Sequence, residues 1–159
     1  MTDSSQQILS ALGRCVGRDH SEARSMPPAF YTSSEFCDLE KTSLFRKQWV
    51  GLGRADQIPK PGDYFTVDLV GEPLIVVRGQ DSQINILSNV CRHRGSLIAE
   101  GAGTAKNFIC PYHAWSYATD GKLLRAPLIA EQSDFDVENC RLPGFACERW
   151  GGFIYVNLS

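Results

Sequence analysis

Two short, turn-prone segments each place a cysteine beside a histidine, and this feature constrains the chain more than any other. The first segment, CRHRG, contains Cys91-x-His93, and the second, CPYHAW, contains Cys110-x-x-His113, with sixteen residues between His93 and Cys110. Two of the chain's three histidines are used in this way. Because thiolate and imidazole both bind transition metals, a fold that brings the segments together would create a metal site.

The bulk properties of the sequence favour one globular domain with an appended element. The chain has 159 residues, of which 43% are hydrophobic, so it can bury a core. Its net charge of −2 and pI near 5.9 give no basic field of the kind that attracts nucleic acid. It has no signal-peptide pattern and no run of about 18 apolar residues. We therefore expect a soluble, cytoplasmic protein that binds neither nucleic acid nor a membrane.

In a reducing compartment, the six cysteines are better explained as buried thiols and metal ligands than as a disulfide framework. Free cysteine packs as a small hydrophobic residue, which is the role expected for the cysteines that have no histidine nearby. These are Cys15, Cys37, Cys140 and Cys147.

In the first third of the chain we expect only helix and irregular structure. Residues 1–29 are polar and without clear periodicity, so we expect a mobile lead-in. Two consecutive prolines then end any preceding helix, and Ser33 or Ser34 can cap a new helix that runs to about Trp49. Residues 30–49 are therefore predicted to form an N-terminal helical region.

From Val50 onward the sequence has the short extended runs of a small antiparallel β domain. DYFTVDLV alternates apolar and polar residues, and the continuous apolar run LIVVR, residues 74–78, is typical of a strand covered on both faces. Asp120 and Gly121 predict a hairpin turn, residues 125–148 look rich in loops, and GGFIYVNLS predicts a last strand. The predicted fold class is mostly β: a small antiparallel β-sandwich with ligand loops at one end, preceded by a helix.

The ligand spacing leaves three interpretations open when it is taken by itself. Two facing loops can present thiolates and imidazoles to an asymmetric two-metal cluster, and ligand type alone does not choose between iron and zinc. A structural zinc site usually pairs cysteine with cysteine and histidine with histidine, whereas each segment here is mixed. The third interpretation is a disulfide accompanied by two incidental histidines.

This mixed arrangement, with the residues around it, resembles the Rieske [2Fe-2S] motif. The resemblance implies that Cys91 and Cys110 bind one iron and that His93 and His113 bind the other. It identifies residues 50–159 as the Rieske domain.

Several neighbours of the ligands are expected to shape the two loops. Pro111 disfavours α conformation for Cys110, and Gly95 lets the first loop turn tightly. A plain packing role is favoured for Trp115. The residues expected to surround the cluster, or to face a partner, are Arg94, Gly95, Pro111, Tyr112 and Trp115.

The resemblance also implies a subgroup. Rieske proteins of respiratory and photosynthetic complexes carry two further cysteines that form a disulfide, and Ser96 and Tyr112 occupy those positions here. The chain is therefore similar to the low-potential branch of the family, toward the lower end of the roughly −150 to +300 mV range. One departure from the common pattern is Ala114, where glycine is more usual.

Residues 30–159 resemble the N-terminal part of the α subunit of a ring-hydroxylating or related non-haem iron oxygenase. The helical region before the β domain favours this over a free-standing Rieske ferredoxin, which remains the alternative. A structural zinc-binding module is a more remote alternative. In such oxygenases two histidines and a carboxylate bind a mononuclear Fe(II). Only His20 is left over here, so we expect the catalytic domain after residue 159 and only electron transfer from this chain.

The resemblance implies partners for the whole protein but leaves its substrate open. The expected electron donor is a flavin-dependent NAD(P)H reductase or a ferredoxin, and the expected assembly is a homotrimer. The pattern is as similar to oxygenases of quaternary amines as to those of aromatic acids.

Overall fold

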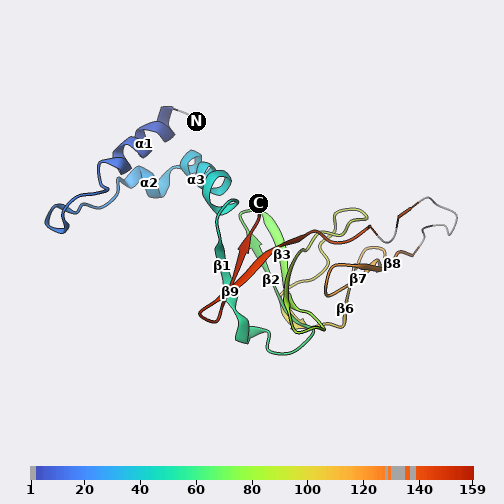
Figure 1. Cartoon of the computed structure of the whole chain (residues 1–159). Coiled ribbons are helices and arrows are strands. Elements are labelled where there is room, and N and C mark those ends of the chain that lie inside the picture. The colour runs from blue at the N-terminus through green and yellow to red at the C-terminus, as the bar shows by residue number, and fades with distance from the viewer. Residues whose placement is uncertain (1–2, 128, 130–134, 137–138) are drawn as a thin grey trace. The chain divides into compact units, whose positions relative to one another are not determined.

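The computed structural model describes residues 3–127, 129, 135–136 and 139–159. The chain divides into two compact units, residues 1–48 and residues 49–159 (Figure 1). No helix in the described part of the chain is long and apolar enough to cross a bilayer.

The first unit is entirely helical. Its α-helices are α1 (Asp3–Gly13), α2 (Pro28–Thr32) and α3 (Ser34–Glu40), with a 3₁₀ turn η1 (His20–Glu22) and a π-helical turn η2 (Lys41–Phe45). Helix α1 packs on α3 and buries Ile8 and Phe36. The mobility expected for residues 1–29 stays a prediction.

The predicted cap of α3 is confirmed, but the predicted end of the helix is not. The Ser33 side chain accepts a hydrogen bond from the Phe36 backbone N–H at 3.2 Å. The regular helix stops at Glu40, followed by η2, and does not reach Trp49. Thr42 explains the change, because its hydroxyl donates to the backbone carbonyls of the preceding turn and disturbs the regular helical ladder.

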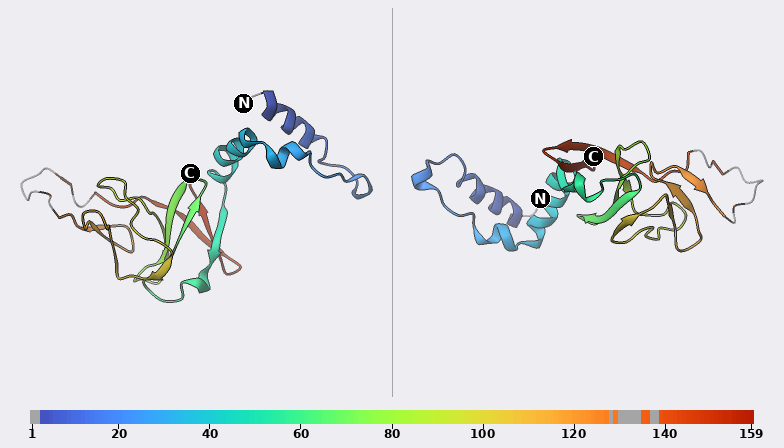
Figure 2. Two further views of the ribbon diagram at one scale, coloured as in Figure 1. Left: turned by 180° about the vertical axis from the view of Figure 1, so that it is seen from behind. Right: turned by 90° about the horizontal axis from the view of Figure 1, so that it is seen from below.

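The second unit is a mostly β fold, as predicted, with antiparallel pairing throughout the described strands (Figure 2). A seven-stranded sheet has the order β1-β10-β9-β4-β3-β2-β5, and a three-stranded sheet has the order β6-β7-β8. The strands are β1 (Val50–Arg54), β2 (Asp63–Leu69), β3 (Glu72–Arg78), β4 (Ile84–Ser88), β5 (Ala102–Thr104), β6 (Asn107–Ile109), β7 (Ser116–Ala118), β8 (Leu123–Arg125), β9 (Gly144–Trp150) and β10 (Phe153–Asn157). A 3₁₀ turn, η3 (Ala55–Gln57), follows β1.

Strand β3 lies between two hydrophobic cores. Leu74 and Val76 belong to the core that includes β10, whereas Ile75 and Val77 belong to the core that includes the cysteines of the two ligand segments. All four side chains are 0% exposed. The prediction that LIVVR forms a strand covered on both faces is therefore confirmed.

Strand β9 is only partly anticipated by the sequence. Residues 144–148, which we expected to lie in a loop-rich region, are its first part. Phe145 and Cys147 alternate with exposed residues and pack against the core that includes β10, but residues 148–150 are all exposed, so the apolar alternation is too short to mark the whole strand. Backbone pairing along β10, and with β4 at Ile86 and Leu87, holds it in the sheet.

The β7–β8 turn gives a test of how tightly the hairpin packs. Gly121 and Gly71 both have positive φ, +87° and +84°. A Cβ atom on Gly121 would lie 3.0 Å from the Leu142 carbonyl oxygen and 3.1 Å from Leu87 Cδ2, whereas one on Gly71 would meet nothing within 4 Å. We expect Gly71→Ala to cost about 1 kcal/mol from backbone strain. Gly121→Ala should cost about 1 to 3 kcal/mol more, because crowding is added.

Urea unfolding of the two variants, followed by circular dichroism, measures this difference. Equal midpoints would show that Leu142 and Leu87 yield to the added methyl group without cost.

Candidate metal centre

The first ligand segment forms the tip of a small hairpin that follows β4. Val90 and Leu97 pair as an isolated antiparallel bridge at its base. Within the loop, the Gly95 N–H donates to the Cys91 carbonyl at 3.0 Å, and the Cys91 N–H donates to the Ser96 carbonyl at 2.9 Å. Gly95 has φ +72°, which glycine adopts without strain, so the tight turn expected at this position is present.

The second ligand segment repeats this frame between β6 and β7. Ile109 and Ser116 pair at its base. The Ala114 N–H donates to the Cys110 carbonyl at 3.0 Å, and the Cys110 N–H donates to the Trp115 carbonyl at 2.8 Å. Ala114 has φ +56°, a conformation that costs a residue with a side chain about 1 to 2 kcal/mol. The frame explains why glycine would be more usual here.

The two loops place the sulfur and nitrogen ligands at different depths. Cys91 and Cys110 are each 2% exposed and belong to the same core. His93 and His113 are half-buried, and their ring centroids lie 4.8 Å apart. The structure therefore brings the four predicted ligands to one end of the unit, with the thiols inside and the imidazoles further out.

His113 has an unusual feature for a buried polar group. Its Nδ1 atom is buried and, among the described residues, has no hydrogen-bond partner, which is also true of Trp115 Nε1. Buried polar atoms are nearly always paired, so an unpaired one requires an explanation. A metal bond to this nitrogen supplies one, because a ligating imidazole uses one ring nitrogen for the metal.

The ligand geometry can be compared with the three interpretations of the sequence. All six cysteines are free thiols, which removes the disulfide interpretation. Among the described residues, no three histidine, cysteine, aspartate or glutamate side chains converge on one point.

Trp115 packs directly against one of the histidines. It is 2% exposed, and its indole stacks on the His93 ring with centroids 4.8 Å apart and planes 2° apart. The indole also contacts the Phe135 ring, with centroids 5.5 Å apart. The packing role expected for Trp115 agrees with this position, which also fixes the plane of the His93 imidazole.

The other residues named from the sequence lie at the surface of the two loops. Tyr112 is 58% exposed, and its ring centroid lies 3.9 Å from that of His113. Arg94, Gly95 and Pro111 are also exposed.

Electrostatics at the site favour a neutral imidazole. The pKa of His93 lies below its ordinary value, first because of desolvation and then because of the neighbouring His113 and Arg94. Neutral imidazole is the form that binds metals.

Sequence reasoning missed Tyr117, which contacts a predicted ligand. The Tyr117 hydroxyl lies 3.4 Å from the Cys91 Sγ and accepts a hydrogen bond from the Arg92 backbone N–H at 3.1 Å. Desolvation, more than the hydrogen bond with Cys91, raises the pKa of this phenol, so it stays protonated and can donate to sulfur. The only available signal was its position two residues after Trp115, the spacing at which residues of an extended segment share a face.

Sequence reasoning also missed the structural role of Asn89, which lies two residues before Cys91. It is 3% exposed, and its amide Nδ2 donates to the Ala99 carbonyl at 2.8 Å. Its Oδ1 accepts from the Ile98 and Ala99 N–H groups at 3.1 and 2.9 Å. One side chain thus ties the segment before the loop to the segment after it.

Comparison with known proteins adds an independent line of evidence. The Rieske [2Fe-2S] domain family matches residues 48–141. The carnitine monooxygenase oxygenase subunit of Acinetobacter baumannii is 38% identical over 138 residues, which cover 86% of this chain and 37% of that protein. The glycine betaine monooxygenase oxygenase subunit of Pseudomonas aeruginosa is 35% identical over 143 residues, covering 89% and 33%. The chain thus spans little more than a third of these relatives.

Solved structures agree with the sequence comparison. A quaternary ammonium Rieske monooxygenase, described in terms of carnitine oxidation and inter-subunit electron transfer, superimposes with a TM-score of 0.80 at 36% identity, over 86% of this chain and 38% of that one. Naphthalene 1,2-dioxygenase from Rhodococcus, bound to indole, superimposes with a TM-score of 0.85 at 26% identity, over 98% of this chain and 35% of that one.

Asn89 gives a testable prediction about the frame of the first loop. Asn89→Ala removes three hydrogen bonds and leaves the N–H and carbonyl of Ala99 unpaired, whereas the Ile98 N–H keeps its bond to the Asn89 carbonyl, so the free energy of unfolding should fall by about 3 kcal/mol. The matched control is Asn85→Ala, which removes a single bond to the Thr119 carbonyl and should cost about 1 kcal/mol. Chemical unfolding midpoints measure both, and similar losses would contradict the role given to Asn89.

Proposed function

The chain belongs to the Rieske [2Fe-2S] domain family, and from this premise we propose that it is the electron-transfer domain of a non-haem iron oxygenase α subunit. The observation that carries the proposal is the pair of equivalent loops, which bury two thiols and leave two imidazoles further out. Cys91 and Cys110 would hold one iron, and His93 and His113 the other. The cluster, when bound, accepts and donates single electrons.

The chain's own residues support this role by holding the ligands and excluding water. The two cysteines share a core with Trp115 and Tyr117, all four being at most 2% exposed. The stacked indole restrains the plane of His93, and the phenol restrains the sulfur of Cys91. Little side-chain motion is then needed when an electron arrives or leaves. The half-buried imidazoles give the shortest route between the site and a partner.

The catalytic iron belongs to another part of the oxygenase in this proposal. The chain has three histidines, of which His93 and His113 are assigned to the cluster. The remaining one, His20, lies in the helical unit. A mononuclear Fe(II) bound by two histidines and a carboxylate would therefore use residues outside this chain, where oxygen activation and hydroxylation or demethylation of the substrate would occur.

A quaternary ammonium compound is the substrate class that we propose for the whole protein. The support is that relatives acting on carnitine and glycine betaine are 38% and 35% identical, whereas two naphthalene 1,2-dioxygenases of solved structure are 31% and 26% identical. The proposed electron donor is a flavin-dependent NAD(P)H reductase or a ferredoxin. Assembly as a homotrimer would let the electron cross to a neighbouring subunit, in line with the inter-subunit transfer described for one relative.

Metal analysis and spectroscopy test the ligand set. Anaerobically purified protein should contain about two iron and two acid-labile sulfide per chain and show a Rieske EPR signal after reduction by dithionite. His113→Ala should abolish that signal, because one iron loses a ligand. His20→Ala, which changes the histidine outside the site, should leave it intact. Zinc without sulfide, or a signal that survives His113→Ala, would overturn the assignment.

Tyr117 is expected to tune the reduction potential. Hydrogen bonds to cluster sulfur atoms stabilise the more negative reduced state, so Tyr117→Phe should lower the potential by about 50 mV, the one-electron equivalent of about 1 kcal/mol. Tyr112→Phe is the matched control, because Tyr112 is exposed and stacks on His113 through its ring. Potentiometric titration followed by EPR compares them, and an unchanged potential in Tyr117→Phe would rule out the hydrogen bond as a determinant.

A further inference from the structure

Aromatic side chains gather on the outer face of the part of the sheet formed by β1, β10 and β9. The pairing of β1 with β10 and of β10 with β9 sets Gly51, Tyr155 and Glu148 in one cross-strand row. The two neighbours of Tyr155 on β10, Ile154 and Val156, are 0% exposed and belong to the core that includes β10. Because successive residues of a strand point to opposite faces, the row faces away from that core.

A hollow of about 340 Å³ lies on this face and is lined by Trp49, Glu148, Trp150 and Tyr155. Trp49 is 47% exposed and Trp150 is 76% exposed. Among the described residues, none of the three aromatic rings in this lining stacks on another ring. Gly51, opposite Tyr155, has no side chain that could cover the phenol. The hollow therefore offers aromatic surface that no neighbouring ring covers.

Glu148 gives the hollow a negative charge. It is the charged member of the lining, it is exposed, and the ion pairs in the described part of the chain involve other residues. Arg149 follows Glu148 on β9, so its side chain points to the opposite face of the strand. Arg46 and Lys47 come shortly before Trp49 in the sequence, but neither lines the hollow. The lining therefore contains a carboxylate and no basic group.

The same face of the sheet already holds one cation on an aromatic ring. The Arg54 guanidinium lies 5.3 Å from the centroid of the Phe153 ring. Phe153 comes two residues before Tyr155 on β10 and therefore shares its face. Arg54 is also paired with Asp56 at 2.7 Å, so its charge is balanced locally and does not cancel that of the hollow.

The lining favours one chemical class of cation. The face of an aromatic ring attracts a cation through the quadrupole of the ring. A primary ammonium or guanidinium group also needs several hydrogen-bond acceptors, whereas the side-chain acceptors here are the Glu148 carboxylate and the Tyr155 hydroxyl. A quaternary ammonium group has no N–H to satisfy, so ring faces and one carboxylate are sufficient for it.

We propose that Trp49, Trp150, Tyr155 and Glu148 form a binding site for an organic cation with a quaternary ammonium group. The rings would contact its methyl groups, and the carboxylate would balance its charge. Binding is reversible and forms no covalent bond. The two ligand cysteines belong to the other core, so this site is separate from the metal centre. The inference goes beyond the proposed function and does not depend on it.

The experiment titrates tetramethylammonium chloride into the ¹⁵N-labelled protein and follows the indole N–H signals of Trp49 and Trp150 by NMR. Both signals should shift and saturate in the millimolar range, because an open hollow removes only part of the water around the cation. Sodium chloride at equal ionic strength should leave both signals in place, because sodium has no methyl groups to pack on the rings.

A pair of probes of equal shape separates charge from apolar contact. Choline carries a quaternary ammonium group, and the matching dimethylbutanol has a neutral carbon atom in place of the nitrogen. Choline should bind about tenfold more tightly than the neutral alcohol, because only the cation is attracted by the rings and the carboxylate. Equal affinities would show that the hollow is simply an apolar patch and would overturn the proposal.

Two variants change the ring surface and the charge separately. Trp150→Leu keeps an apolar side chain but removes one ring face, and it should weaken the binding of tetramethylammonium about fivefold. Glu148→Gln keeps the shape of the side chain but removes its charge, and it should weaken binding about threefold. The indole signal of Trp49 reports binding in both variants.

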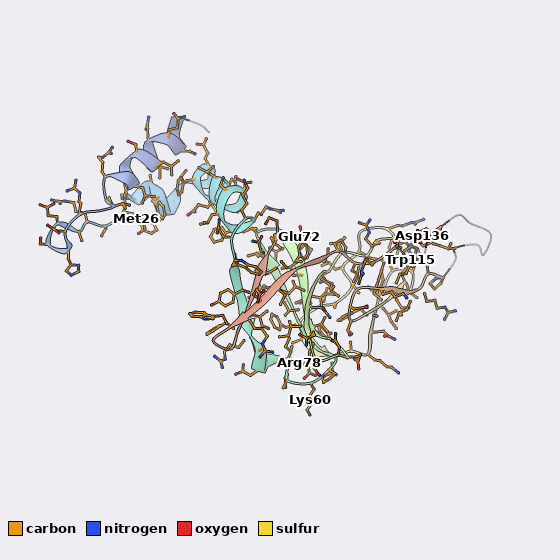
Figure 3. All side chains as sticks on the ribbon, viewed as in Figure 1. Met26, Lys60, Glu72, Arg78, Trp115 and Asp136 are labelled. Carbon is orange, nitrogen blue, oxygen red and sulfur yellow. The ribbon has the colours of Figure 1, made fainter. Side chains whose placement is uncertain are left out.

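The matched controls change similar side chains outside the hollow. Glu72→Gln removes a carboxylate on β3 (Figure 3), where Glu72 lines a different hollow together with Arg92. Tyr31→Leu removes an aromatic ring that is 66% exposed on α2. Both variants should bind tetramethylammonium as the parent protein does. A loss in Glu72→Gln equal to that in Glu148→Gln would show that net charge alone decides binding, and it would overturn the site.

Two further outcomes would contradict the proposal. The absence of a saturable shift in the parent protein would show that the hollow binds no such cation. Shifts that follow the protein concentration, and not the tetramethylammonium concentration, would assign this face to a second copy of the chain. Should Trp150→Leu fail to fold, the paired probes and Glu148→Gln still decide the question. Because the titration measures no electron transfer, its result leaves the assignment of the cluster unaffected.

Discussion

The hydrogen-bonded frame that closes each ligand loop is the feature on which the rest of the site depends. In both loops the cysteine N–H and carbonyl bond to the fifth and fourth residues that follow it. The residues just outside the frame pair as an antiparallel bridge. This pairing satisfies the backbone groups around a buried thiol, which would otherwise be costly to bury. The frame thus fixes each cysteine through its backbone.

Strand β3 separates the core that holds Cys91 and Cys110 from a second hydrophobic core. Side chains of β3 alternate between the core that holds both ligand cysteines and the core that includes β10. A strand that is buried on both faces can carry two cores only because its successive residues point in opposite directions. The site-bearing core contains polar groups such as the Tyr117 hydroxyl, whereas the buried members of the second core, among them Ile154 and Val156, are all aliphatic.

Features that depend on neighbouring residues could be predicted from the sequence. Features that depend on pairing between distant segments could not. The covered strand LIVVR, the Asp120-Gly121 turn and the Ser33 cap depend on neighbouring residues, and all three are confirmed. Strand β9 is held by pairing with β10 and β4, and the alternation of Phe145 and Cys147 is too short to mark the whole strand in the sequence. Tyr117 and Asn89 act across 26 and 10 residues, so only the folded structure relates them to the site.

The different depths of sulfur and nitrogen give the site a direction. The buried thiols face the core and a phenol O–H, whereas the half-buried imidazoles face the surface. An added electron is stabilised most where charge is best solvated, and that is the side of the histidines. In the proposed ligand set, His93 and His113 would hold the iron on this more solvated side, where an added electron would be the more stable. The same two side chains would also give the shortest path to a partner.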